Sequence, residues 1–234
     1  LTTSIEDVTA QTFNGSIGAT TTFQTGDILN GEKASGNTLN LTVSDQSVAS
    51  TATTAELNDV QVINVRNVDA ADGDIGLNAI LWSGVSQIWN DASYEVDGSL
   101  GGNALTVSGV QEAATVGLRN TNTSSKVTFA DTVYADGGTV AVAVSSAGSS
   151  TTDSTITIGQ ASGAGTATAV TIDAAGTNYL TLASGNEVGS AFKSLTVTGT
   201  GSLNLDATSE LSGTALANEM TTVDASANSG GVTL

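Results

Sequence analysis

The sequence predicts an all-β protein, either a parallel β-solenoid of the β-helix or β-roll kind or an elongated β-sandwich. Short stretches of alternating apolar and polar residues recur along the 234 residues, and Gly, Asn, Asp and Ser connect them. Only 4% of the residues are aromatic, so Val, Leu, Ile and Ala must fill the core in regular layers. Proline is absent, so the 27 glycines must supply many of the turns. These features favour a repetitive β-architecture over an α/β core.

The expected strands follow this period-two pattern in chain order. In TLNLTV, residues 38–43, the apolar Leu39, Leu41 and Val43 alternate with polar residues. The polar positions of the expected strands are mostly Thr and Ser, which suit the outer surface of a pleated sheet. The other expected strands are residues 104–110, 126–133, 139–144, 155–158, 169–172, 179–182, 194–197 and 202–205.

One segment has a different periodicity. Residues 208–220, TSELSGTALANEM, place Leu211, Ala215 and Leu216 near helical spacing. This is the best helix candidate in the chain, and it predicts either a short helix or a wide loop.

A weak internal repeat consists of one apolar residue, two polar residues and then alternating apolar residues. It begins at Leu57, Val85, Phe192 and Met220, and both Leu57–Val85 and Phe192–Met220 are 28 residues apart. Stacked coils of a solenoid produce recurring lengths of this kind. Four loose matches in a low-complexity sequence also arise by chance, so the repeat favours a solenoid without establishing one.

The charge balance limits the partners of the protein. Lys and Arg number 5 and Asp and Glu number 23, which gives a net charge of −18. Five scattered cations cannot neutralise a polyphosphate, so we expect no nucleic-acid partner, and anionic lipid is disfavoured for the same reason. No apolar run is long enough for a transmembrane helix, so membrane insertion is not expected. The surplus carboxylates either keep a surface protein soluble or bind divalent cations, of which calcium suits oxygen ligands best.

The residue types argue against catalysis. The chain has no Cys and no His, which removes disulfides, thiol and imidazole chemistry and the usual zinc ligands. Paired carboxylates can act as acid and base in a glycosidase, but a sugar-cleaving site normally also needs aromatic platforms and Arg or His to hold its substrate. We therefore expect no enzymatic activity.

Carboxylates gather in several expected turns between strands. Calcium takes six to eight oxygen ligands, and a tight turn with Asp side chains and free carbonyl groups offers several at once. The most suggestive turn is VDAADGDIG, residues 68–76, although it lacks EF-hand spacing and is equally compatible with a solvated Asp-Gly turn. The candidate calcium ligands are Asp27, Asp69, Asp72, Asp74, Asp91, Glu95, Asp97, Asp131 and Asp136.

Residues 25–43 carry a resemblance to a known family. TGDILNGEKASGNTLNLTV resembles a degenerate GD-x-LNGG-x-G-x-DTLNL segment, related to the glycine- and aspartate-rich nonapeptide (RTX) repeats. It departs from that pattern at Glu32, which replaces a glycine, and at Asn37, which replaces an aspartate. Those positions ligate calcium in the family, so the resemblance predicts the following strand more firmly than an ion at this turn. LNDVQVINV and MTTVDASANSGGVTL are also similar to segments of surface-layer and other large cell-surface proteins exported by type I secretion.

The resemblance implies a structural role outside a Gram-negative cell. The chain would be a calcium-stabilised segment of a surface-layer (S-layer) protein, with further copies of itself in a two-dimensional lattice as principal partners. Residues 1–56 would form a degenerate RTX-like β segment and residues 57–234 a repetitive solenoid-like segment, unless the two make one continuous domain. The chain opens LTTSIEDVTAQ without a Met, so we expect a piece of a longer protein.

Two other classes of function remain open. The chain could be an adhesin or biofilm-matrix segment whose acidic loops bind a surface or a cell-surface polysaccharide. Trp82, Trp89 and Tyr94 lie in one acidic stretch and would form its contact patch, although two Trp seven residues apart more often mark local packing. The third class, a polysaccharide-degrading β-helix or phage tail spike, is disfavoured by the scarcity of basic residues.

Overall fold

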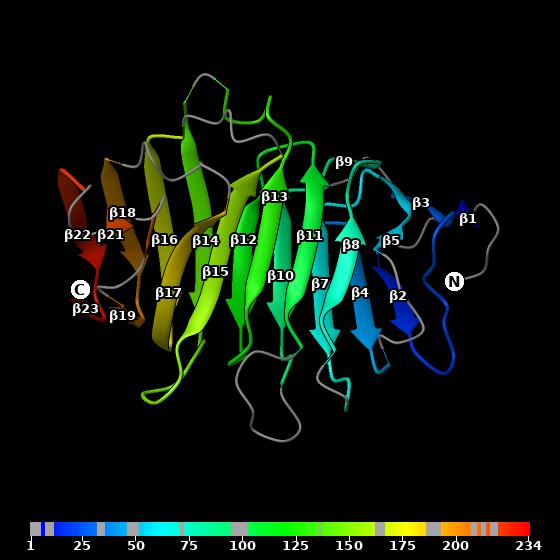
Figure 1. Ribbon diagram of the computed structural model, residues 1–234, viewed down its shortest axis with the longest axis horizontal. Helices are drawn as coiled ribbons and strands as arrows, with labels where there is room; N and C mark the ends of the chain where they lie inside the picture. The colour runs from blue at the N-terminus through cyan, green and yellow to red at the C-terminus, as the bar shows by residue number, and fades with distance from the viewer. Residues whose placement is uncertain are drawn as a thin grey trace.

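Parallel β-sheets dominate the structure, and every regular element of the described residues is a β-strand (Figure 1). The computed structural model describes residues 6–7, 12–31, 36–45, 52–70, 73–94, 103–135, 137–161, 167–185, 193–206, 210–211, 214–215 and 220–234. The strands stack as successive coils, so the predicted all-β parallel solenoid is confirmed. No helix long and apolar enough to span a membrane occurs among these residues.

The strands form three parallel sheets and one small antiparallel pair. The nine-stranded sheet consists of β2 (Thr12–Ile17), β4 (Thr38–Val43), β7 (Val62–Asn67), β10 (Gln87–Asp91), β12 (Thr115–Arg119), β14 (Thr139–Ser145), β16 (Ala169–Ala175), β18 (Ser194–Gly199) and β22 (Thr222–Asn228). The eight-stranded sheet consists of β5 (Thr53–Thr54), β8 (Ile75–Asn78), β11 (Leu105–Val110), β13 (Ser125–Phe129), β15 (Ser154–Gln160), β17 (Thr177–Gly185), β19 (Ser202–Leu205) and β23 (Val232–Thr233). The four-stranded sheet consists of β1 (Glu6–Asp7), β3 (Ile28–Asn30), β6 (Glu56–Asn58) and β9 (Trp82–Ser83), and the antiparallel pair of β20 (Glu210–Leu211) and β21 (Thr214–Ala215).

From β4 onward, each coil of the chain crosses both large sheets. From β4 to β9 the chain visits the nine-stranded, the eight-stranded and the four-stranded sheet in turn, and from β10 onward it alternates between the two large sheets apart from the β20–β21 pair. In Figure 1 the eight-stranded sheet lies in front of the nine-stranded sheet, its strands run in the opposite direction, and the two termini lie at opposite ends. All neighbouring strands within these sheets are parallel, as expected when each strand is separated from its partner by a whole coil.

The coil length varies along the solenoid. Val62 pairs with Thr38, 24 residues earlier, whereas Val170 pairs with Val140, 30 residues earlier. The repeat expected between Phe192 and Met220 matches the register at that end, because Lys193 and Thr221, 28 residues apart, are hydrogen-bonded across coils.

The spacing between Leu57 and Val85 does not match the register. Leu57 pairs with Trp82, so the expected equivalence with Val85 is wrong by three positions. The physical reason is that loops of unequal length join the coils, and spacing within a low-complexity sequence does not fix which residues stack.

The core consists of small apolar side chains stacked in rows along the solenoid axis. One row runs through eight coils of the nine-stranded sheet, and every member is at most 3% exposed. Its members are Phe13, Leu39, Ile63, Ile88, Val116, Val142, Ile172 and Val197. The alternation seen in the sequence therefore places one apolar face inward on the strands of this row, as period-two patterning requires.

Amide side chains connect the coils outside this apolar core. On the outer face of the nine-stranded sheet the Asn40 amide donates to Asn14 Oδ1 at 3.2 Å, and the Asn64 amide donates to Asn40 Oδ1 at 2.9 Å. At a buried corner, the Asn178 amide donates to the Ala175 and Ser202 carbonyls at 2.9 and 3.0 Å. The bonds of Asn178 give the two corner carbonyls a side-chain donor, and the Asn–Asn bonds link the outer faces of adjacent coils.

Two local expectations are corrected by the structure. The strand expected over residues 126–133 ends at Phe129, and the chain turns so that the Tyr134 ring meets the Phe129 ring edge-on, with centroids 5.2 Å apart. For residues 208–220, where a short helix or a wide loop was expected, the helix alternative is wrong at the described positions, because β20 and β21 pair antiparallel there. Both segments had ambiguous periodicity, and their tertiary contacts decided between the alternatives.

The large sheets continue past the expected boundary at residue 56. The strand β6 spans residues 56–58, and β4 pairs directly with β7 in the nine-stranded sheet. The division into residues 1–56 and 57–234 stays a prediction about the sequence, while the sheets on either side are continuous.

Candidate functional site

The predicted calcium ligands lie at separate places in the structure. Asp72, Glu95, Asp97 and Asp136 lie outside the described residues. Across the part of the chain that the structure describes, no three His, Cys, Asp or Glu side chains form a group suited to a metal ion. Asp27, Asp69, Asp74, Asp91 and Asp131 are therefore considered one by one.

Asp27 is a buried carboxylate at the corner before β3. It is only 1% exposed, and its Oδ2 accepts the Gln24 N–H at 2.9 Å. Its Oδ1 is buried without a hydrogen-bond partner. A buried carboxylate oxygen in this state is costly, which marks this corner as one that a cation or water molecule would stabilise.

The described residues 68–70 and 73–74 lie between β7 and β8, where the turn was expected. Asp69 is 4% exposed, and its carbonyl accepts the Asn103 amide at 3.1 Å. Asp74 is exposed, and its Oδ1 accepts the Ala104 N–H at 2.9 Å. Asp69 therefore contacts this corner through its main-chain carbonyl and Asp74 through its carboxylate, with Asn103 and Ala104 as the respective partners.

Asp91 and Asp131 have other surroundings. Asp91 is paired with Arg119, whose Nε and Nη2 donate to Oδ1 and Oδ2 at 2.9 and 2.6 Å. This two-pronged bond compensates the charge of Asp91 and raises the pKa of Arg119. Asp131 lies half-buried in the turn after β13.

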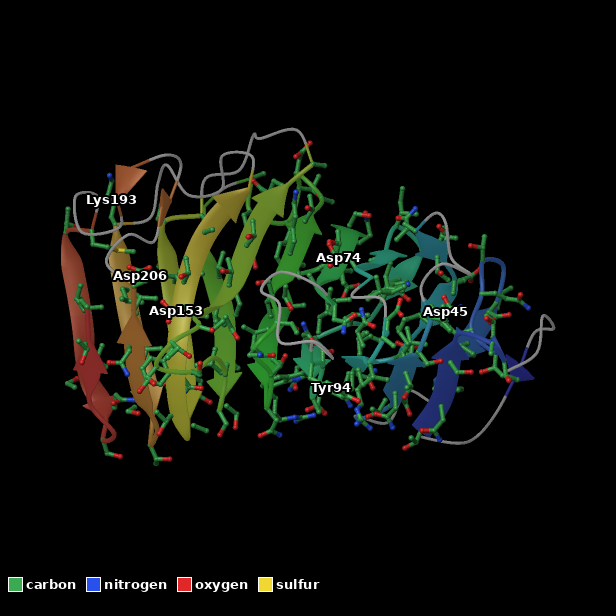
Figure 2. The ribbon with its side chains drawn as sticks, turned by 60° about the horizontal axis from the view of Figure 1, so that its bottom comes forward. Asp45, Asp74, Tyr94, Asp153, Lys193 and Asp206 are labelled. Carbon is green, nitrogen blue, oxygen red and sulfur yellow. The ribbon has the colours of Figure 1, made fainter. Side chains whose placement is uncertain are left out.

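The structure brings together two acids that sequence reasoning missed, Asp153 and Asp206. Figure 2 shows them close together over the strands of the eight-stranded sheet. They line a surface hollow of about 510 Å³ whose other walls are hydroxyl and amide side chains. The lining residues are Asn122, Thr123, Ser124, Ser150, Thr151, Thr152, Asp153, Thr155, Thr181 and Asp206.

Coils on either side of β17 position these two acids, Asp153 before β15 and Asp206 after β19. Asp206 follows β19, and its N–H donates to the Leu180 carbonyl at 2.9 Å, so it continues the row of Thr155 and Thr181. Asp153 precedes β15 after a tight turn that begins at Gly148, whose φ of +70° favours glycine. The two carboxylates are 53 positions apart in sequence (206 − 153), so no local motif could have predicted their approach.

The surroundings of Asp153 in this hollow disfavour the charged form of its carboxyl group. The pKa of Asp153 is raised, first by partial desolvation and then by the negative charge of Asp206, while a hydrogen bond from Thr181 opposes the shift. Among the lining residues that the structure describes, none is Lys or Arg. The arrangement offers two carboxylates and several hydroxyl oxygens, the ligand types of a hard cation.

The raised pKa of Asp153 predicts a pH effect. A carboxyl whose pKa is higher in the folded state favours folding as the pH falls through that pKa, and it opposes folding above it. We expect Asp153→Asn to be more stable than the wild type at pH 7 in chelator, by less than about 1 kcal/mol because the group is exposed. The difference should shrink as the pH is lowered toward 4, measured by urea unfolding at each pH.

Asp224→Asn is the control of opposite sign. Hydrogen bonds from Ser226 lower the pKa of Asp224, so that carboxylate favours folding at neutral pH and loses its effect as the pH falls. A stability gain in Asp224→Asn equal to that in Asp153→Asn would contradict the assignment.

The aromatic residues of the acidic stretch do not share one environment. Trp82 is 4% exposed within the core, whereas Tyr94 is 46% exposed beyond the end of β10. Trp89 is half-buried on the outer face of the nine-stranded sheet, beside a second hollow of about 260 Å³. Packing is thus the role of Trp82, while Trp89 presents an indole ring at the surface.

No protein-family model matches the chain, and comparisons with curated proteins and with solved structures find no significant match. Function must therefore be inferred from the side chains and their arrangement.

Proposed function

We propose that the chain is a structural segment of a calcium-stabilised, self-assembling surface-layer protein on the outside of a Gram-negative cell. The observation that carries the proposal is that Asp153 and Asp206 come close together in one hollow lined by hydroxyl groups, in a chain of net charge −18. A bound divalent cation would offset the repulsion within the pair and tie β15 to β19, which belong to different coils.

The residues present fit a calcium ion. Two carboxylates can contribute up to four oxygens, and the hydroxyl groups of Thr155 and Thr181 lie in the same hollow. The buried Oδ1 of Asp27, which has no hydrogen-bond partner among the described residues, is a candidate ligand for a separate ion at the other end of the solenoid. Water completes the coordination of calcium in open sites of this kind.

The repetitive coils support a mechanical role. Rows of side chains stack along the axis and connect each coil only to its neighbours, so that stabilising one contact between coils stiffens the whole rod. The outer faces present mostly Thr, Ser, Asn and Ala, which are small and can pack against another copy at a low desolvation cost. We assign the self-contacts to these flat faces.

Calcium is expected to raise the stability of the protein. A site filled at 100 times its dissociation constant adds about 2.7 kcal/mol to the free energy of unfolding. We expect a higher Tm in millimolar calcium than in excess chelator, and a smaller increment in Asp153→Asn and in Asp206→Asn. In chelator Asp153→Asn should instead be the more stable protein, so the sign of its effect reverses with calcium.

The matched control is Asp74→Asn, which changes an exposed acid of the sequence-predicted turn. If this variant alone loses the calcium increment, the ion belongs to residues 68–76 and the assignment to Asp153 and Asp206 is wrong. If the Tm of the wild type is the same in calcium and in chelator, the calcium part of the proposal fails.

Assembly is tested separately from calcium binding. Calcium titration followed by light scattering and electron microscopy should give ordered sheets of the full-length protein. Isolated fibres or single rods would favour the adhesin or biofilm-matrix alternative, which the surface-exposed ring of Trp89 supports. Calcium-dependent folding without any assembly would support the structural calcium ion and contradict the proposed lattice.

A further inference from the structure

The second hollow lies on the outer face of the nine-stranded sheet, next to Trp89. It exists because outward positions on two neighbouring strands, β12 and β14, carry small residues, Gly117, Ala141 and Ala143. A Cβ atom at Gly117 would overlap the indole ring, so the ring of Trp89 covers the space that a side chain at this position would fill. Beyond the ring the hollow is lined by Gln87, Trp89, Thr115, Ala141, Val142, Ala143, Thr171 and Asp173.

The indole ring is held in place without any ligand. Its Nε1–H donates to Gln87 Oε1 at 2.8 Å, and the Arg119 guanidinium carbon lies 5.0 Å from the ring centroid. Arg119 is itself fixed by its two bonds to Asp91. Pre-organisation of this kind lowers the entropy cost of binding, because neither the ring nor its neighbours must be ordered by the ligand.

Charge disfavours an anionic ligand, and the guanidinium already at the ring of Trp89 competes with a cationic one. Asp173 lines the hollow in a chain of net charge −18, which repels an anionic ligand. A cationic ligand would meet the Arg119 guanidinium that already interacts with the ring of Trp89. A neutral ligand is therefore favoured.

Size and polarity restrict the ligand further. The hollow of about 260 Å³ is smaller than the roughly 300–1,000 Å³ of typical small-molecule pockets, which suits a single ring. A stable protein interface needs roughly 800 Å² of surface on each side and usually several aromatic anchors at its centre. Trp82 cannot serve as a second anchor beside Trp89, because it is buried in the core. Hydroxyl, amide and carboxylate groups on the rim would be left unpaired by a purely apolar ligand.

We propose that this hollow binds one neutral pyranose unit of a glycan. The indole ring of Trp89 contacts the apolar face of the sugar ring, and Thr115, Thr171 and Asp173 exchange hydrogen bonds with its hydroxyl groups. The Trp89 indole supplies the apolar contact area and the rim supplies orientation, which is the usual division of roles in a small-molecule site. This inference does not depend on calcium or on lattice formation.

The test uses acrylamide quenching of tryptophan fluorescence together with calorimetry. Because Trp82 is buried, quenching reports mainly on Trp89. The ligands are neutral oligosaccharides of glucose, galactose, mannose and N-acetylglucosamine, with polygalacturonate as the acidic and tetramethylammonium as the cationic comparison. We expect at least one neutral oligosaccharide to protect Trp89 and to bind with a Kd of about 1 mM or tighter.

Two variants and one control make the test specific. Trp89→Ala removes the platform, and Gly117→Ala displaces the ring while leaving its chemistry in place. Both should weaken sugar binding by about 10-fold or more, the equivalent of losing about 1.4 kcal/mol. Thr38→Ala changes an outward residue of β4, in the same sheet but outside the lining of the hollow, and should bind as the wild type does.

Circular dichroism confirms folding of each variant, and Gly117→Ala remains informative if Trp89→Ala does not fold. Absence of binding by every neutral sugar at about 10 mM overturns the proposal. Equal binding by all variants, or binding of only the acidic or the cationic comparison, overturns it as well. Loss of the calcium effect without loss of sugar binding would remove the structural proposal and leave this one standing.

Discussion

Phe129→Ala is expected to lower the free energy of unfolding by about 3–5 kcal/mol, the usual cost of truncating a buried aromatic side chain. Phe129 is fully buried at the end of β13, and its ring packs edge-on against Tyr134 at an interplanar angle of 77°. In a core built mainly from small aliphatic residues, few neighbours can move to fill the cavity. Urea unfolding followed by circular dichroism measures the loss.

A second measurement reports on the same cavity. Burial raises the pKa of Tyr134 to about 12, so water admitted by Phe129→Ala should lower that pKa toward its ordinary value. Ultraviolet titration of the tyrosines shows the change. Lys126→Ala, on the outward face of the same strand, should alter stability by no more than about 0.5 kcal/mol. A loss below about 1 kcal/mol in Phe129→Ala would contradict the described packing.

Gly199→Ala is expected to destabilise the protein nearly as strongly, through the backbone. Gly199 has a φ of +94°, which costs an L-residue about 1–3 kcal/mol. A Cβ atom there would also overlap the Ala174 carbonyl oxygen and lie 2.9 Å from the Ala174 nitrogen on the neighbouring coil. Relieving that overlap means separating two stacked coils, at a further cost of about 1–3 kcal/mol.

The matched control for this prediction is Gly26→Ala. Gly26 has a φ of +95°, and a Cβ atom there would have no neighbour within 4 Å. It therefore carries the dihedral strain without the steric overlap. We expect urea unfolding to show a clearly larger loss for Gly199→Ala than for Gly26→Ala. Equal losses would mean that the close approach between coils contributes nothing.

The secondary structure was largely predictable because it depends on a local signal. All nine stretches expected as strands contain strands of the structure, and Leu39, Leu41 and Val43 face the core as their alternation requires. Strands outside those nine stretches, such as β2 and β12, were not expected. Within the expected segments the errors occurred where that signal weakened, at the end of β13 and within residues 208–220. There the turn chemistry and the pairing with other segments decided the outcome.

The candidate sites were much less predictable. Asp69 and Asp74 were correctly expected to share a turn, but their partners there are the Asn103 amide and the Ala104 N–H. Asp91, a predicted calcium ligand, instead meets Arg119 from the next coil. The hollow of Asp153 and Asp206 and the hollow of Trp89 both depend on which residues stack. The spacing between paired residues varies, from 20 for Leu105 and Ser125 to 31 for Ser125 and Ile156, and this variation hides the register in the sequence.

The sequence by itself determined the strands, the inward and outward faces and the acidic surface, because alternation and charge are properties of neighbouring residues. Only the tertiary structure decided which side chains of different coils meet. Asp153 approaches Asp206, and the ring of Trp89 covers Gly117, because loops of unequal length bring their strands into register. Contacts between coils are long-range, and a local pattern with a period of two residues cannot encode them.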